Sequence, residues 1–278
     1  MSDLRALPGS VSMNLSPCMQ WNRSAMIKIL SRLWALSMAF QALSPVFAAD
    51  KPIHLFILSG QSNMAGMNPA LGFEPELARA FPDAETAYIK IAVGGRPIRQ
   101  WVKDWNDIAG RHGVGVQFMR PTSEEPIFYG QILSGFSSML KEHPQPSSVT
   151  FCWMQGERDA SEKLDAAYAE ALRQLIANLR RDVNHKEMNV VIGRVSDFGA
   201  ATDISWQNIR AAQVEVARTD PRGAWIDCDD LNDKVQGGQE RNDLHYTRAG
   251  YELLGRRFVR QAEALITGRI PADNGRPE

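Results

Sequence analysis

The serine at position 62 lies in the segment LSGQSNM (58–64), at the point where an apolar run ends. A serine hydroxyl becomes an effective nucleophile only when a base lies beside it and N–H donors face it. A place at the end of a strand, before a turn or helix, exposes the hydroxyl and directs backbone N–H groups at the same space. Ser62 is therefore a candidate nucleophile, although the same pattern also fits an ordinary helix N-cap.

A histidine that could serve as its base lies in NDLHYT (242–247), just before the last amphipathic segment. A histidine base needs a carboxylate that fixes its tautomer and stabilises the imidazolium. Asp243 is two residues away and can reach the ring only if the turn folds back. His245 and Asp243 are therefore a candidate base and its partner, and a purely structural histidine is the alternative.

Two further segments offer groups for the same reaction. In WMQGERD (153–159), Gln155 provides an amide for a developing negative charge, and Glu157 provides a carboxylate that could orient an imidazole. The alternative for this segment is the capping of a following helix. In VGGR (93–96), the glycine pair allows close approach of the backbone, and an N–H of Gly94 or Gly95 could complete an oxyanion hole. The alternative there is a tight turn.

These segments must be positioned by the elements around them. Apolar, β-branched runs alternate with amphipathic segments of helical length, a pattern typical of a parallel sheet covered on both faces. Because ligands bind at the carboxyl ends of parallel strands, the four segments are expected to meet at one edge of the sheet. The expected strands are His54–Gly60, Ala87–Gly95, Val149–Gln155, Asn189–Val195 and Ala224–Asp227, and the expected helices are Tyr129–Lys141, Leu164–Arg181, Trp206–Arg218 and Ala249–Ile266.

Taken together and in this order, the segments GQSNM, GG, WxQGExD and DLHY resemble the sialate O-acetylesterase and carbohydrate esterase family 6 branch of the SGNH hydrolases. The resemblance extends from about His54 to Ile266. It implies a flavodoxin-like, three-layer α/β/α sandwich around a five-stranded parallel sheet. It also implies a carbohydrate O-acetylesterase that works through an acyl-enzyme, with an acetylated sugar as substrate and neither metal nor cofactor.

Carried over by position, the resemblance implies Ser62 as nucleophile and His245 as general base. It implies the Ser62 N–H, the Gly95 N–H and the Gln155 side chain as oxyanion donors. The family pattern has an aspartate three residues before the histidine, where this chain has Asn242. The supporting carboxylate is thus Asp243 or Glu157, and we favour Asp243 because a neighbour in the same loop needs no long-range fit.

Substrate contacts are expected from residues around the serine and after the glycine pair. Gln61 and Asn63 flank Ser62, and Trp101 offers an aromatic face on which a sugar ring could stack, with core packing as its alternative. An SGNH lipase or thioesterase would use the same catalytic residues with an apolar acyl channel. A carbohydrate-binding module with a degenerate site is the alternative outside enzymes, and Asn242 is its best support.

The composition limits the possible partners. The 278 residues include 31 Lys plus Arg against 32 Asp plus Glu, so the net charge of -1 gives no electrostatic footprint for nucleic acid or an anionic membrane. Cys152 and Cys228 fall in or beside expected strands, where a free thiol and a disulfide are both possible. No clustered His/Cys pattern predicts a metal site.

The beginning of the chain carries a targeting pattern. Residues 26–48 combine a basic start, a short apolar stretch and small residues near Ala48, which predicts a signal peptide and export to the periplasm or medium. Residues 1–25 are then a disordered extension or an over-long start. The apolar stretch is too short to span a bilayer comfortably, and an uncleaved anchor or a buried helix is the alternative. Residues 49–278 are expected to form a single esterase domain without stable membrane insertion.

Overall fold

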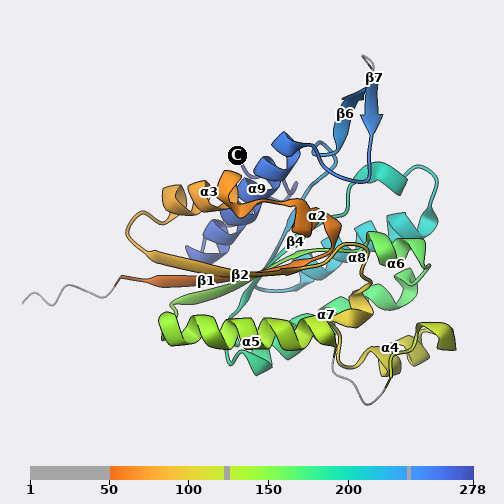
Figure 1. Ribbon diagram of the computed structural model, residues 1–278, viewed down its shortest axis with the longest axis horizontal. Helices are drawn as coiled ribbons and strands as arrows, with labels where there is room; N and C mark the ends of the chain where they lie inside the picture. The colour runs from red at the N-terminus through yellow and green to blue at the C-terminus, as the bar shows by residue number, and fades with distance from the viewer. Residues whose placement is uncertain (1–50, 122–125, 237–238) are drawn as a thin grey trace, which may run out of the picture. The chain divides into compact units, whose positions relative to one another are not determined.

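A five-stranded parallel sheet lies at the centre of the computed structural model, which describes residues 51–121, 126–236 and 239–278 (Figure 1). The strand order is β2-β1-β3-β4-β5, and every neighbouring pair is parallel. This order confirms the flavodoxin-like, SGNH-type sheet predicted from the sequence. The strands are β1 Ile53–Gly60, β2 Glu85–Ala92, β3 Ser148–Met154, β4 Asn189–Gly193 and β5 Gly223–Ile226.

Burial follows the position of each strand in the sheet. The central strands β3 and β4 are buried along their whole length, as their continuous apolar runs predict. Strand β2 is only half-buried, because it forms an edge of the sheet. It also ends at Ala92 rather than at Gly95, because the chain turns through the glycine pair and Gly95 adopts a φ of 66° that L side chains rarely adopt.

Helices cover both faces of the sheet, which confirms the three-layer prediction. The helices α3 (Phe73–Ala80) and α9 (Arg248–Ile266) pack together on one face. On the other face lie α5 (Ile127–Glu142), α7 (Asp165–Asp182) and α8 (Ile204–Thr219) (Figure 1). Each helix turns an apolar stripe towards the sheet, where it packs into a single hydrophobic core.

Smaller elements that the sequence did not predict surround the carboxyl ends of the strands. Three are short helices, α2 (Ser62–Gly66), α4 (Trp105–Arg111) and α6 (Glu157–Ser161). The strands β6 (Asp233–Gln236) and β7 (Gln239–Asn242) form an antiparallel pair that stands out from the sandwich in Figure 1.

The segment after α9 runs back along the outer edge of β5. The Asp227 N–H donates to the Gly275 carbonyl over 2.9 Å, and the indole N–H of Trp225 donates to the Asp273 carbonyl over 3.1 Å. An ion pair of 3.0 Å joins the Arg276 guanidinium to the Asp227 carboxylate. This segment therefore lies against the carboxyl end of β5, the edge strand opposite β2.

Both Cys152 and Cys228 are free, buried thiols, so the free-thiol alternative holds for these two residues. In the described part of the chain, no helix is long and apolar enough to cross a membrane. The predictions for residues 1–25 and 26–48 concern positions outside the described residues.

The order of the strands also indicates where a ligand would bind. From β1 the chain goes first to β2 on one side and then to β3 on the other, so the direction of winding changes between β1 and β3. Open parallel sheets bind ligands in the crevice at such a switch point, at the carboxyl ends of the strands. The ends of β1 and β3 are Gly60 and Met154, just before the segments that contain Ser62 and Gln155.

Candidate active site

Ser62 is placed by a tight contact between the ends of β1 and β3. The Gln61 N–H donates to the Met154 carbonyl over 2.9 Å, and Gly60 has a φ of 149°. A Cβ on Gly60 would lie 1.9 Å from the Met154 carbonyl oxygen, so only glycine allows this approach. The chain then enters α2 with Ser62 as its first, partly exposed residue.

A cavity of about 500 Å³ lies against Ser62 and brings together four of the segments that the sequence singled out. Its volume is within the range of small-molecule sites. Residues of the β1, β2, β3 and β4 ends and of the loop before α9 contribute to its wall. The lining residues are Gln61, Ser62, Gly94, Gly95, Glu157, Arg158, Ser161, Phe198, Trp206, Leu244 and His245.

Backbone donors are available at the serine side of this cavity. The Gly94 backbone lies against the serine, because a Cβ on Gly94 would be 3.7 Å from the Ser62 Cβ. Among the described residues, the N–H groups of Ser62, Gly94 and Gly95 have no hydrogen-bond acceptor. Free N–H groups beside a serine are the donors that an oxyanion hole requires.

Gln155 is fully buried and does not line the cavity. Its amide nitrogen lies 3.2 Å from Gln61 Oε1 and 3.1 Å from the Arg96 carbonyl, and it also donates to the Asp159 carboxylate. These contacts join the ends of β1, β2 and β3. Its role as an oxyanion donor remains a prediction, and the amide already has three acceptors within the protein.

The side chains that flank Ser62 also bind other parts of the site. Gln61 lines the cavity, and its Oε1 accepts the Arg158 N–H over 3.2 Å. Asn63 is completely buried, donating to Glu157 Oε1 over 2.8 Å and to the Leu244 carbonyl over 3.1 Å. Of these two flanking residues, both predicted as substrate contacts, only Gln61 therefore faces the cavity.

The two candidate carboxylates have different surroundings. Asp243 Oδ1 accepts the backbone N–H of His245 over 3.0 Å, and Oδ2 pairs with the Lys234 ammonium over 3.0 Å. The His245 N–H and the Lys234 contact hold the pKa of the Asp243 carboxyl below its ordinary value. Asp243 therefore shapes the loop that contains the histidine.

Glu157 is 4% exposed and lines the cavity together with His245. Its Oε1 accepts the Asn63 amide, but its Oε2 is buried with no hydrogen-bond partner in the described part of the chain. Burial raises the pKa of the Glu157 carboxyl. An N–H donor from the cavity side would satisfy Oε2 and stabilise the carboxylate.

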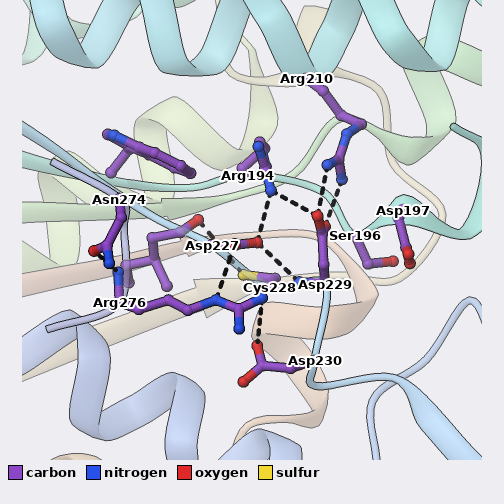
Figure 2. Close-up of polar contacts among 12 residues, drawn as sticks. Arg194, Ser196, Asp197, Arg210, Asp227, Cys228, Asp229, Asp230, Asn274 and Arg276 are labelled. Carbon is purple, nitrogen blue, oxygen red and sulfur yellow. Dashed lines mark hydrogen bonds and ion pairs between the residues drawn. The ribbon is translucent and has the colours of Figure 1, made fainter. Parts of the chain in front are cut away.

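Ion pairs hold the loop between β5 and α9, which leads to His245 (Figure 2). The Arg194 guanidinium pairs with Asp227 over 2.6 Å and with Asp229 over 2.7 Å, and Arg210 also pairs with Asp229 over 2.7 Å. Ion pairs that share partners in a network hold side chains in place better than isolated surface pairs do. They fix the start of the loop against β4 and α8.

Further along the same loop, Asn232 is a fully buried residue that the sequence did not single out. Its amide nitrogen donates to Asn242 Oδ1, to the Asp243 carbonyl over 2.7 Å and to Ser196 Oγ over 3.1 Å. Asn242, which replaces the family's aspartate, in turn donates to Asp197 Oδ1 over 2.7 Å. Asn242 thus has a structural role between the loop and the end of β4.

The expectation for Trp101 needs correction. Its side chain is completely buried, its indole N–H donates to Ser59 Oγ over 2.9 Å, and its ring packs against Trp153. It lies in the core rather than in the cavity, so it cannot stack on a sugar. The aromatic residues of the cavity are Phe198 and Trp206, which the sequence analysis did not select, and their ring centroids are 5.8 Å apart.

The switch-point sheet, with Ser62 after β1 and His245 before α9, has the SGNH-hydrolase arrangement that the sequence resembles. The chain belongs to the carbohydrate esterase, sialic acid-specific acetylesterase family, whose model matches residues 65–264. It is therefore a carboxylic ester hydrolase by family. The matched region includes Glu157 and His245 and begins just after Ser62.

Solved structures show the same fold at low sequence identity. A protein from Arabidopsis thaliana has a TM-score of 0.54 and 17% identity, over 79% of this chain and 100% of that one. A carbohydrate acetylesterase from Xanthomonas citri has a TM-score of 0.53 and 17% identity, over 78% of this chain and 57% of that one. NanS has a TM-score of 0.52 and 14% identity, over 78% of this chain and 98% of that one. No curated protein matches the sequence.

Proposed function

We propose that the protein removes O-acetyl groups from carbohydrate by two-step acyl transfer, with Ser62 as nucleophile and His245 as general base. The observation that carries this proposal is that one cavity has Ser62, His245 and the buried Glu157 carboxylate in its wall. These are the nucleophile, base and orienting acid that serine hydrolases combine.

In the first step, His245 takes the Ser62 proton while Oγ attacks the ester carbonyl carbon. The N–H groups of Ser62 and Gly95 stabilise the oxyanion of the tetrahedral intermediate. The bond to the sugar oxygen then breaks, and His245 gives its proton to that oxygen. In the second step His245 deprotonates a water molecule, which attacks the acetyl-serine. The bond to Ser62 Oγ then breaks, His245 returns the proton to Oγ, and acetate leaves.

Glu157 is the proposed partner of the His245 ring, in preference to Asp243. Its free Oε2 needs a donor, whereas both oxygens of Asp243 already accept hydrogen bonds. A buried carboxylate also stabilises an imidazolium more strongly than an exposed one, because water screens it less. Asp243 then positions the loop rather than the ring.

The experiment that tests the function compares hydrolysis of p-nitrophenyl acetate, butyrate and octanoate by the protein and by Ser62→Ala. We expect acetate-selective turnover that Ser62→Ala abolishes. A preference for octanoate would instead favour a lipase or thioesterase. Equal, background rates in the protein and the variant would contradict an esterase and leave a carbohydrate-binding module.

Export is part of the proposal and rests on residues 26–48. Expression of the whole chain in a bacterium with a secretion pathway should give a shortened periplasmic or external product. N-terminal sequencing of that product would locate the cleavage near Ala48, and an uncut cytoplasmic product would contradict export.

A further inference from the structure

A second cavity adjoins the candidate catalytic cavity, and we propose that it binds a neighbouring, carboxylate-bearing sugar of the same glycan. This inference rests on the proposed esterase function and specifies its substrate: an acidic oligosaccharide rather than a single sugar.

The two cavities share a wall. The second has a volume of about 730 Å³ and lies between the end of β4 and the β6–β7 hairpin. Phe198 lines both cavities, so the two lie against the same side chain. Each cavity alone has the size of a small-molecule site, and a ligand that fills both must be longer than one sugar. The second cavity is lined by Phe198, Lys234, Val235, Arg241, Asn242, Asp243 and Thr247.

Of the two cationic side chains that line the second cavity, one is available to bind a ligand. Lys234 and Arg241 lie opposite each other in the register of β6 and β7. Lys234 is neutralised by Asp243 over 3.0 Å. Within the described residues, the Arg241 guanidinium has no hydrogen bond or ion pair. A free guanidinium binds carboxylates through two parallel hydrogen bonds, which makes it suited to the carboxylate of a uronic acid.

Phe198 supplies an apolar face between the two cavities. Its side chain is 47% exposed, although it is a large aromatic residue next to a polar loop. Trp206 supports it from the core side, at 5.8 Å between ring centroids. An exposed aromatic ring held in this way can stack on a sugar, because the C–H face of a pyranose is apolar. Phe198 therefore takes the role that the sequence analysis gave to Trp101.

The test compares a substrate confined to the first cavity with substrates that extend into the second. The probes are p-nitrophenyl acetate, acetylated xylo-oligosaccharides that carry glucuronic acid, and acetylated xylo-oligosaccharides of equal length without it. The variants are Arg241→Gln, Arg241→Lys and Phe198→Ala. Arg222→Gln is the matched control, because Arg222 is a partly exposed arginine that precedes β5, at the amino ends of the strands and away from the cavities at their carboxyl ends, and pairs with Glu187.

We expect the protein to prefer the acidic oligosaccharide, and Arg241→Gln to lower kcat/KM for it by about tenfold or more. Rates on p-nitrophenyl acetate and on the neutral oligosaccharide should stay near those of Arg222→Gln. Arg241→Lys should keep part of the preference, and added salt should weaken it. Phe198→Ala should lower kcat/KM for both oligosaccharides by a larger factor than for p-nitrophenyl acetate.

Equal kcat/KM for acidic and neutral oligosaccharides in the unmodified protein would overturn the inference. So would an Arg241→Gln effect of the same size on all three probes, or an absence of oligosaccharide turnover beside Ser62-dependent p-nitrophenyl acetate hydrolysis. If p-nitrophenyl acetate hydrolysis does not depend on Ser62, the esterase function itself fails, which is a separate and recognisable result.

Discussion

The amide nitrogen of Asn63 lies 2.8 Å from Glu157 Oε1 and binds the Leu244 carbonyl with the same nitrogen. The residue after Ser62 therefore connects the buried Glu157 carboxylate to the residue before His245. All three groups come from different parts of the chain, so this side chain joins the segments that contain the proposed acid and base.

Removing this amide should loosen the site. Asn63→Ala leaves a buried carboxylate oxygen without its donor, which costs about 1–3 kcal/mol of unfolding free energy and lowers kcat. Urea unfolding and p-nitrophenyl acetate kinetics measure the two effects. Tyr251→Phe is the graded control, because it removes only the hydroxyl that donates to Asn63 Oδ1. Equal losses in both variants would contradict the role given to the Asn63 nitrogen.

The choice between the two carboxylates can be measured directly. Glu157→Gln keeps the acceptor for Asn63 but removes the charge, so we expect kcat to fall by about 10²–10⁴. Asp243→Asn should stay within about tenfold of the unmodified rate, because Asp243 contacts the backbone of His245. Far-ultraviolet circular dichroism verifies that both variants fold. The reverse order of the two losses would assign the role to Asp243.

The contact between Gly60 and Met154, just before Ser62, should be intolerant of any side chain. Gly60→Ala places a Cβ against the Met154 carbonyl at a positive φ, and we expect a loss of about 1–3 kcal/mol or more in unfolding free energy. Gly110→Ala is the control, since Gly110 lies in α4 with open space around it, and alanine there should stabilise by about 0.5–1 kcal/mol. Thermal unfolding of both variants measures the contrast.

A buried aspartate should make stability depend on pH. Burial raises the pKa of Asp159 to about 7, whereas the unfolded chain releases this proton near its ordinary value of 3.8. Between these two values the folded state keeps the Asp159 proton while the unfolded chain has lost it. The contribution of Asp159 to the free energy of unfolding therefore falls as pH rises from about 4 to 7. Asp159→Asn should remove that fall, which is on the order of a few kcal/mol.

Urea unfolding at pH 5 and pH 7.5 provides the comparison, because other titrating groups cancel between the protein and the variant. Asp107→Asn, at an exposed site in α4, is the matched control and should keep the slope of the unmodified protein. An identical slope in Asp159→Asn would mean that Asp159 is charged in the folded state at both pH values.

The parallel sheet could be predicted from the sequence because the pattern that indicates it is repeated along the chain. Five apolar runs separated by amphipathic segments leave few arrangements other than a covered parallel sheet. The β6–β7 hairpin could not be predicted in this way. Its strands DKVQ and QERN contain a single apolar residue, Val235, and so show no hydrophobic pattern. Its strands pair through the backbone, which a hydrophobic pattern cannot predict.

Individual side chains in the site were harder to place for a geometric reason. The spacing of Asp243 and His245 predicts proximity, but not whether the carboxylate meets the ring or the backbone N–H. Trp101 and Phe198 are both large aromatic residues, so residue type alone does not show which of them contacts a sugar. Trp101 lies in the core, whereas Phe198 lines the cavity. The direction in which a side chain points depends on the path of the backbone after each strand. The type of a residue does not predict that path.

The segment that runs along β5 has a consequence for association between molecules. An uncovered edge strand presents free N–H and C=O groups to which another strand can add. Here the Gly275 carbonyl occupies the Asp227 N–H, and the Arg276 side chain adds a charge beside it. Residues 272–276 therefore occupy one end of this edge. We expect their removal to lengthen the free edge and make the folded protein less soluble, while the cavity beside Ser62 keeps every residue of its wall.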